Sequence, residues 1–123
     1  MESKEKFSLR SRLCSFRYAF SGLLRFFRTE HNAWIHLLAA VLVVLAGLVF
    51  RLTKGEWTGI AFSIGLVLCA EVFNTCIEKM MDLLSPVRDE RVKYIKDLAA
   101  GAVLVAAATA AVIGLLIFIP RLI

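Results

Sequence analysis

Apolar side chains repeat along the chain in four segments. In the first, residues 9–29, they recur at steps of three and four residues and fall within about 100° of arc on one helical face. Arginines gather on the other side, a pattern typical of a basic amphipathic helix lying in the membrane interface. The sequence therefore predicts a surface helix over 9–29, preceded by a flexible polar segment over 1–8.

Three longer apolar stretches follow, over 31–50, 57–84 and 98–120. Each is long enough to cross the hydrocarbon core, which takes about 20 helical residues. The first follows a basic region, as in a signal peptide, but no small-residue cleavage site appears, so we expect it to be retained. The predicted fold class is an all-α integral membrane protein: one domain, residues 1–123, with an N-terminal amphipathic surface helix and three transmembrane helices.

Composition and charge agree with a membrane protein. The chain has 123 residues, is 59% hydrophobic and carries a net charge of +5, which excludes a disordered chain or an ordinary soluble domain. Three cysteines without CxxC spacing indicate neither a disulfide framework nor a zinc site. Lys and Arg cluster before residue 29 and over 87–96 and are sparse at the other membrane ends. This asymmetry favours a cytoplasmic N-terminus and argues against nucleic acid as the partner.

A row of polar side chains interrupts the second apolar stretch. Glu71, Asn74, Glu78 and Asp82 share one helical face about 80° wide and about 16 Å long, and we call them the acidic stripe. Because charge inside a bilayer is costly, such a row is expected to face away from lipid and to be functional. Mg²⁺ suits the stripe, since it takes hard oxygen ligands and binds through one or two carboxylates plus a substrate phosphate.

A stripe that reaches from cytosol towards headgroup depth suits phosphoryl transfer from a soluble donor to a lipid hydroxyl. Glu78 could take Mg²⁺ at the donor phosphates, with Glu30 completing the metal site, while the deeper Glu71 could accept the hydroxyl proton. Lys96 supplies a cation for phosphate, and Asp97 a carboxylate that could orient it or bind the nucleotide's sugar. The GxxxxGK[ST] and GxGxxG signatures are absent, which argues against a soluble-kinase plan.

The run EVFNTCIEKMMD, followed after a short basic loop by IKDLAAGAVLV, resembles the signature of the prokaryotic diacylglycerol kinase family. Members are small trimeric integral-membrane lipid kinases with a surface helix and three spans, and the resemblance covers about residues 10–121. It implies ATP as co-substrate, Mg²⁺ as cofactor and a membrane lipid alcohol as acceptor. It also implies a homotrimer with sites shared between subunits, in the bacterial cytoplasmic (inner) membrane.

Carried over by position, the resemblance implies that Glu71 is the catalytic base and that Asn74 serves catalysis. It implies metal ligation by Glu30 and Glu78, and contact with the lipid substrate at Glu71 and Ala100. The ATP-binding residues that it implies are Tyr18, Glu30, Glu78, Asp82, Lys96 and Asp97. The sequence departs from the family pattern at Ser11, where the family has an arginine, and at Val87-Arg88-Asp89, where it often has Glu-Tyr-His.

The lipid acceptor is inferred from similarity alone. The run EHNAWIH over 30–36, the Glu56-Trp57 pair and the ending Ile119-Pro120-Arg121 resemble the undecaprenol kinase branch more than the proteobacterial diacylglycerol kinase branch. Undecaprenol is therefore the favoured substrate, with diacylglycerol as the alternative. His36 has no evident link to lipid choice, and we expect it to be a packed or hydrogen-bonded residue.

Structural alternatives stay open for several candidates. Asn74 could join helices by hydrogen bonding, Asp82 could be a solvated helix end, and Lys96 and Asp97 could merely flank a span. A remote alternative function is a non-enzymatic oligomeric cation channel or transporter. A pore would need acidic residues towards both membrane faces, whereas the deep ones here all lie in the half expected to be cytoplasmic.

Overall fold

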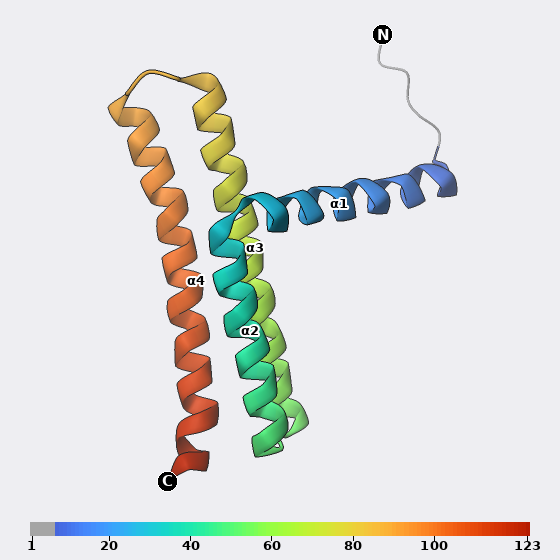
Figure 1. Cartoon of the computed structure of the whole chain (residues 1–123), viewed down its shortest axis with the longest axis vertical. Helices are drawn as coiled ribbons and strands as arrows, with labels where there is room; N and C mark the ends of the chain where they lie inside the picture. The colour runs from blue at the N-terminus through green and yellow to red at the C-terminus, as the bar shows by residue number, and fades with distance from the viewer. Residues whose placement is uncertain (1–6) are drawn as a thin grey trace. The chain divides into compact units, whose positions relative to one another are not determined.

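The structure is a computed structural model that describes residues 7–123. This part of the chain is all-helical, and Figure 1 shows its elements in order. The four helices are α1 (Leu9–Thr29), α2 (His31–Phe50), α3 (Lys54–Leu84) and α4 (Glu90–Leu122). The sequence predicts a flexible segment over residues 1–8, of which residues 1–6 lie outside the described residues.

The chain divides into two compact units, Met1–Trp34 and Ile35–Ile123. In the first unit, the Ser8 hydroxyl caps α1 by accepting a hydrogen bond from the backbone N–H of Ser11. The helix ends where the backbone N–H of Glu30 donates to the carbonyl of Phe26 at 3.0 Å. The second unit holds most of α2 and all of α3 and α4, and it carries the acidic stripe.

Helices α2, α3 and α4 are each long and apolar enough to cross a membrane. At 1.5 Å per residue the 31 residues of α3 span about 46 Å, more than the roughly 30 Å hydrocarbon core. Large apolar side chains such as Leu48, Phe62 and Leu116 are exposed on their flanks. Exposed apolar flanks are expected of helices whose solvent is lipid.

Helix α3 begins at Lys54, before the predicted boundary at residue 57. A capping box fixes this start: the Thr53 hydroxyl accepts from the backbone N–H of Glu56 at 3.3 Å, and the Glu56 carboxylate accepts from the N–H of Thr53 at 3.1 Å. The predicted range, 57–84, covered the apolar part of the helix only. The capped first turn precedes that part.

Helix α4 begins at Glu90, eight residues before the predicted 98, and continues through Pro120 to Leu122. The Asp89 carboxylate caps it by accepting from the backbone N–H of Arg91 at 2.8 Å. The Arg91 guanidinium also donates to both oxygens of this carboxylate, and these side-chain hydrogen bonds, followed by the backbone one, hold the pKa of Asp89 below its usual value. Because its pKa is lowered, Asp89 stays ionised and caps the helix to a more acidic pH than an ordinary aspartate would. The stabilisation is lost as pH falls through that lowered pKa.

The turn between α2 and α3 contains a residue with positive φ and a glycine in close contact with a tryptophan ring. Arg51 has a φ of 54°, and the N–H of Leu52 donates to the carbonyl of Gly47 at 3.2 Å, as in a Schellman motif. Gly47 lies directly against the Trp57 ring, where an added Cβ would come within 2.6 Å of a ring atom. The glycine thus permits close contact between the end of α2 and the start of α3.

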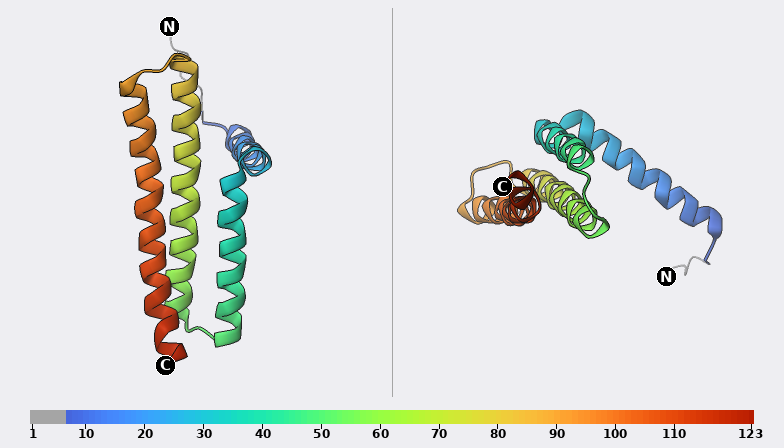
Figure 2. Two further views of the ribbon diagram at one scale, coloured as in Figure 1. Left: turned by 60° about the vertical axis from the view of Figure 1, so that its left-hand side comes forward. Right: turned by 90° about the horizontal axis from the view of Figure 1, so that it is seen from below.

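Helices α3 and α4 run antiparallel side by side (Figure 2). Gly59 permits this packing, since a Cβ there would lie 3.2 Å from Ile113. Near the α2–α3 turn, the Arg121 guanidinium forms an ion pair with the Glu56 carboxylate and donates to the carbonyl of Phe50 at 2.8 Å. Arg121 therefore ties the ends of three helices together.

Candidate active site

The acidic stripe turns inward at its deep end and becomes exposed towards the α3–α4 loop. Glu71 is only 3% exposed and Asn74 only 8%, whereas the apolar Phe73 between them is 64% exposed. Farther along α3, Glu78 is half-buried and Asp82 is exposed. Burial therefore falls steadily along the stripe, with the carboxylates turned away from the apolar outer face.

Two contacts organise the buried end. The Asn74 amide donates to Glu78 Oε1 at 3.4 Å, and His36 Nε2 of α2 lies 3.5 Å from Glu71 Oε2. Asn74 Oδ1 is buried and has no hydrogen-bond partner among the described residues. Because buried polar atoms are normally paired, this oxygen marks a place where a group from outside the described chain can bind.

The exposed end of the stripe connects to α4. The Lys96 ammonium donates to the Asp82 carboxylate at 2.5 Å, across the α3–α4 loop. Asp97 instead accepts from Lys93 at 2.7 Å, one helical turn earlier on α4. The adjacent Lys96 and Asp97, predicted as one phosphate-binding pair, thus contact different partners.

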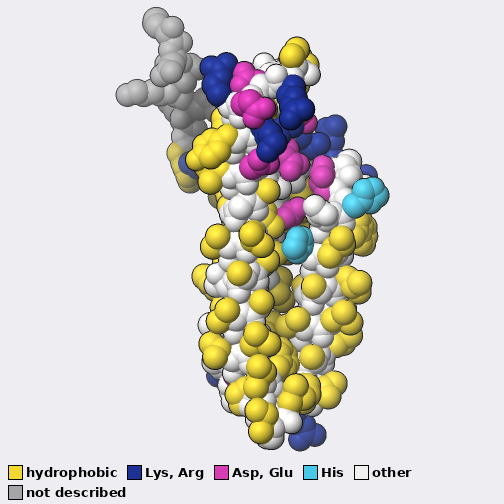
Figure 3. Space-filling model, turned by 90° about the vertical axis from the view of Figure 1, so that its left-hand side faces the viewer, with side chains coloured by type: hydrophobic (Ala, Val, Ile, Leu, Met, Phe, Trp, Pro, Cys, Tyr) yellow, Lys and Arg dark blue, Asp and Glu magenta, His cyan; other side chains and the backbone are white. Residues whose placement is uncertain are grey.

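Around these pairs lies a polar cavity of about 600 Å³, which we call the loop cavity. Three cations and three carboxylates border it, and charged side chains gather at this end of α3 and α4 (Figure 3). Its lining residues are Asp82, Ser85, Pro86, Val87, Arg88, Asp89, Val92, Lys93, Lys96 and Asp97. Such a cavity can bind a polyanion through its cations while the carboxylates keep them oriented.

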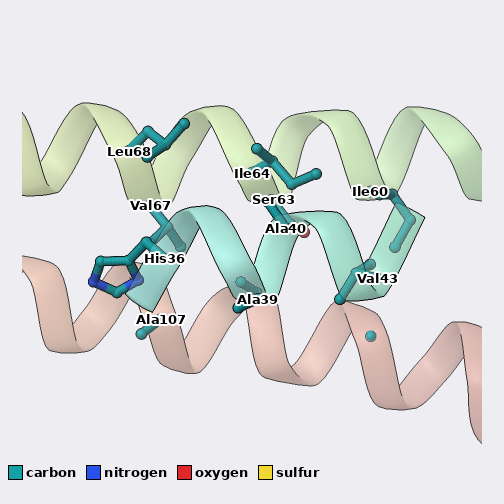
Figure 4. A pocket seen from close by; sticks show the side chains of 12 residues that line it. His36, Ala39, Ala40, Val43, Ile60, Ser63, Ile64, Val67, Leu68 and Ala107 are labelled. Carbon is teal, nitrogen blue, oxygen red and sulfur yellow. The ribbon is translucent and has the colours of Figure 1, made fainter. Parts of the chain in front are cut away.

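A second cavity, of about 220 Å³, lies among α2, α3 and α4, and we call it the apolar groove. His36 stands at one end of it, and small and branched apolar side chains line the rest (Figure 4). Its lining residues are His36, Ala39, Ala40, Val43, Ile60, Ser63, Ile64, Val67, Leu68, Ala107, Ala110 and Gly114. Ser63 donates its hydroxyl to the carbonyl of Gly59 at 2.8 Å, so it offers no hydrogen to a ligand.

Three other predicted site residues lie on or at the end of α1 and on α4. Tyr18 is exposed on α1 and Glu30 is half-buried at the end of α1, both in the unit Met1–Trp34. Ala100 is exposed on α4. Tyr18, Glu30 and Ala100 keep the roles implied by the resemblance as predictions.

Residues 7–123 contain no group of three or more His, Cys, Asp or Glu side chains that could hold a metal by themselves. Mg²⁺ does not require one, because it keeps several waters and binds through one or two carboxylates together with substrate phosphates. The Glu78 carboxylate is a hard oxygen donor, and the Asn74 amide one turn earlier donates a hydrogen bond to it. The residues present therefore fit a magnesium ion that arrives with a nucleotide.

Sequence reasoning missed the partner of Glu71 and the role of Lys93. The Lys93–Asp97 pair has the i, i+4 spacing on a helix and could have been found from that signal. His36 and Glu71 lie 35 positions apart in the sequence and on different helices. No periodicity within either helix predicts which faces of the two helices meet.

Comparison with known proteins decides the family. The sequence model described as Prokaryotic diacylglycerol kinase matches residues 17–118. The chain belongs to the prokaryotic diacylglycerol kinase family. An undecaprenol kinase of Bacillus subtilis is 41% identical over 108 residues, covering 88% of each chain. A diacylglycerol kinase of Synechocystis is 37% identical over 111 residues, covering 89% of this chain and 63% of that one.

Membership of the prokaryotic diacylglycerol kinase family confirms the resemblance and the reaction class predicted from the acidic stripe. The chain is a membrane lipid kinase of the undecaprenol or diacylglycerol kinase type. With three apolar helices of spanning length, it is a multi-pass membrane protein.

Proposed function

We propose that this kinase transfers the γ-phosphoryl group of Mg-ATP to the hydroxyl of undecaprenol, giving undecaprenyl phosphate and ADP. The observation that carries the proposal is the end of the apolar groove at His36, which contacts the buried carboxylate of Glu71. A hydrocarbon chain in the groove would bring its terminal hydroxyl to a base at the boundary between apolar and polar surroundings.

The loop cavity supports nucleotide binding at the other end of the acidic stripe. Lys96, Lys93 and Arg88 offer the cations that triphosphate oxygens need. Glu78 and Glu30 stay the proposed ligands of Mg²⁺, and the ion, when bound, would neutralise charge on the phosphates.

In the proposed reaction the lipid oxygen bonds to the γ-phosphorus, and the bond from that phosphorus to the bridging oxygen breaks. ADP leaves with the bonding electrons, and the hydroxyl proton passes to the Glu71 carboxylate. Asn74 donates to Glu78 and would orient that carboxylate. Tyr18, Asp82 and Asp97 remain proposed ATP contacts, and Ala100 a proposed lipid contact.

The surroundings of the site support a larger assembly. We include in the proposal a homotrimer whose sites share residues between subunits, since the exposed flanks of α3 and α4 leave room for a neighbour. We also include α1 as a surface helix on the cytoplasmic side of the bacterial inner membrane.

Undecaprenol is preferred over diacylglycerol on the chemistry of the groove. Diacylglycerol carries two ester carbonyls next to its hydroxyl, and along the groove only His36 and Ser63 have polar side chains, with the Ser63 proton already donated. Burying an unpaired polar group costs about 1–3 kcal/mol, so the discrimination should be about 5- to 150-fold.

The test is turnover by the purified protein in detergent with Mg-ATP and each lipid at equal mole fraction. We expect kcat/KM for undecaprenol to exceed that for diacylglycerol by about fivefold or more. A preference for diacylglycerol would assign the alternative activity, phosphatidic acid synthesis at the same site. Absence of phosphoryl transfer to either lipid would remove the proposal.

Filling the groove should impair the reaction with the long-chain lipid. At Gly114 an added Cβ meets nothing within 4 Å, so Gly114→Leu places its side chain in the groove without a backbone clash. Displacing two or three methylenes at about 0.8 kcal/mol each predicts a loss of about 15- to 60-fold in kcat/KM for undecaprenol. Gly65→Leu is the matched control, because Gly65 has equal space but lies outside the groove. Equal activity in the two variants would show that the chain binds elsewhere.

A further inference from the structure

His36 has no role in the proposed phosphoryl transfer, although it lies beside the proposed base Glu71. Its Nε2 lies 3.5 Å from Glu71 Oε2, and the His36 side chain is 24% exposed whereas that of Glu71 is 5% exposed. The imidazole also lines the apolar groove, at the end shown in Figure 4. One side chain therefore borders both the proposed base and the proposed path of the lipid chain.

A carboxylate as buried as Glu71 needs a partner that can donate a hydrogen bond or carry positive charge. Along α3, the amide of Asn74 is already engaged with Glu78. On α4, Lys96 is paired with Asp82 and Lys93 with Asp97. In the part of the chain that the structure describes, the recorded ion-pair partner of Glu71 is thus the imidazole of α2.

We infer that His36 is the positioning residue of the catalytic base: its Nε2–H is directed at Glu71 Oε2 and leaves Oε1 to take the proton of the lipid hydroxyl. The inference rests on the proposed function and deepens it. The separation of 3.5 Å is longer than a hydrogen bond, and such contacts in apo enzymes tighten when substrate is bound. A lipid chain in the groove would also contact the imidazole, since His36 lines the groove.

The role of His36 at Glu71 can be tested separately from metal and ATP binding, because those functions involve other side chains. His36 contacts Glu71 from α2, and Asn74 and Glu78 follow on α3. On α4, Lys96 pairs with Asp82 and Asp97 pairs with Lys93. Loss of the imidazole therefore leaves the metal carboxylate and the loop cavity untouched. It should misalign the base while ATP binding stays as it was.

The activity test compares His36→Leu with His36→Gln, because a glutamine amide can donate to the carboxylate and leucine cannot. For His36→Leu we expect kcat to fall about 10- to 100-fold, as for a misplaced catalytic group, with KM for Mg-ATP unchanged. For His36→Gln we expect kcat within about threefold of the parent protein. His31→Leu is the matched control, since His31 is exposed and is the other histidine of the chain. Full kcat in His36→Leu, or equal losses in leucine and glutamine variants, would overturn the assignment.

A second measurement does not depend on turnover. With ¹⁵N-labelled histidine in detergent micelles, Glu71→Gln should shift the ring-nitrogen resonances of His36 and leave those of His31 in place. Unchanged His36 resonances would show that no interaction joins the two side chains. Inactivity of the unaltered protein would contradict the proposed function, whereas normal activity with insensitive His36 variants would contradict only this inference.

Discussion

Glutamine in place of Glu71 should lower kcat for lipid phosphorylation by about 10²- to 10⁴-fold, the usual contribution of a positioned general base. Glutamine has the same shape and can occupy the same buried place, but it cannot accept the hydroxyl proton. Glu71 is 3% exposed, so water has little access to replace the lost carboxylate. Initial rates at saturating Mg-ATP and lipid measure the effect.

The control for this variant is Glu56→Gln, which removes a carboxylate at the opposite end of α3, where Glu56 pairs with Arg121. That change should affect thermal stability and leave kcat within about threefold. Gel filtration and thermal unfolding of Glu71→Gln verify that the fold is kept. Turnover at the parental rate by folded Glu71→Gln would assign the base elsewhere.

Replacing Lys96 by methionine should have the second largest effect, on the nucleotide. The Lys96 ammonium pairs with the Asp82 carboxylate, and both side chains line the loop cavity. A hydrogen bond to a charged group contributes about 1.5–3 kcal/mol, which predicts a loss of about 10- to 150-fold in kcat/KM for Mg-ATP. Titration of ATP at saturating lipid measures it, with Lys54→Met as the control for loss of an exposed ammonium.

The partner of Lys96 provides a sharper form of the same experiment. If Asp82 acts by holding Lys96, then Asp82→Asn should cost little more when Lys96 has already been replaced. The double variant should therefore resemble Lys96→Met alone, a departure from additivity that a double-mutant cycle resolves. Fully additive losses would mean that Asp82 contacts the nucleotide independently of Lys96.

Much of the fold was predictable because bilayer-spanning helices are set by apolar length. The ends of the helices were less so: α4 begins at Glu90 because Asp89 caps it, and a search for apolar stretches ignores such charged turns. The start of α3 was available from the sequence, since Thr53 and Glu56 have the capping-box spacing.

The inward direction of Glu71 was predictable from the spacing of the acidic stripe, because four polar residues on one face cannot all meet lipid. The partners of these residues were not. Lys96 reaches back to Asp82 across the loop, and His36 meets Glu71 from another helix. Both contacts depend on how helices rotate against each other, which side-chain packing determines and which no single-helix pattern records.

The contacts of Arg121 with Glu56 and Phe50 hold α2, α3 and α4 together at one end of the helices. Ion pairs join α3 to α4 at both ends, through Glu56 and Asp82. Helix α2 is joined to them by the hydrogen bond from Arg121 to Phe50 at one end and by the 3.5 Å contact of His36 with Glu71 towards the other. If the proposed lipid binds in the groove, we expect its tail to enter and leave where α2 carries His36, because the contact there is longer than a hydrogen bond. How long the product resides in the enzyme becomes a property of that helix.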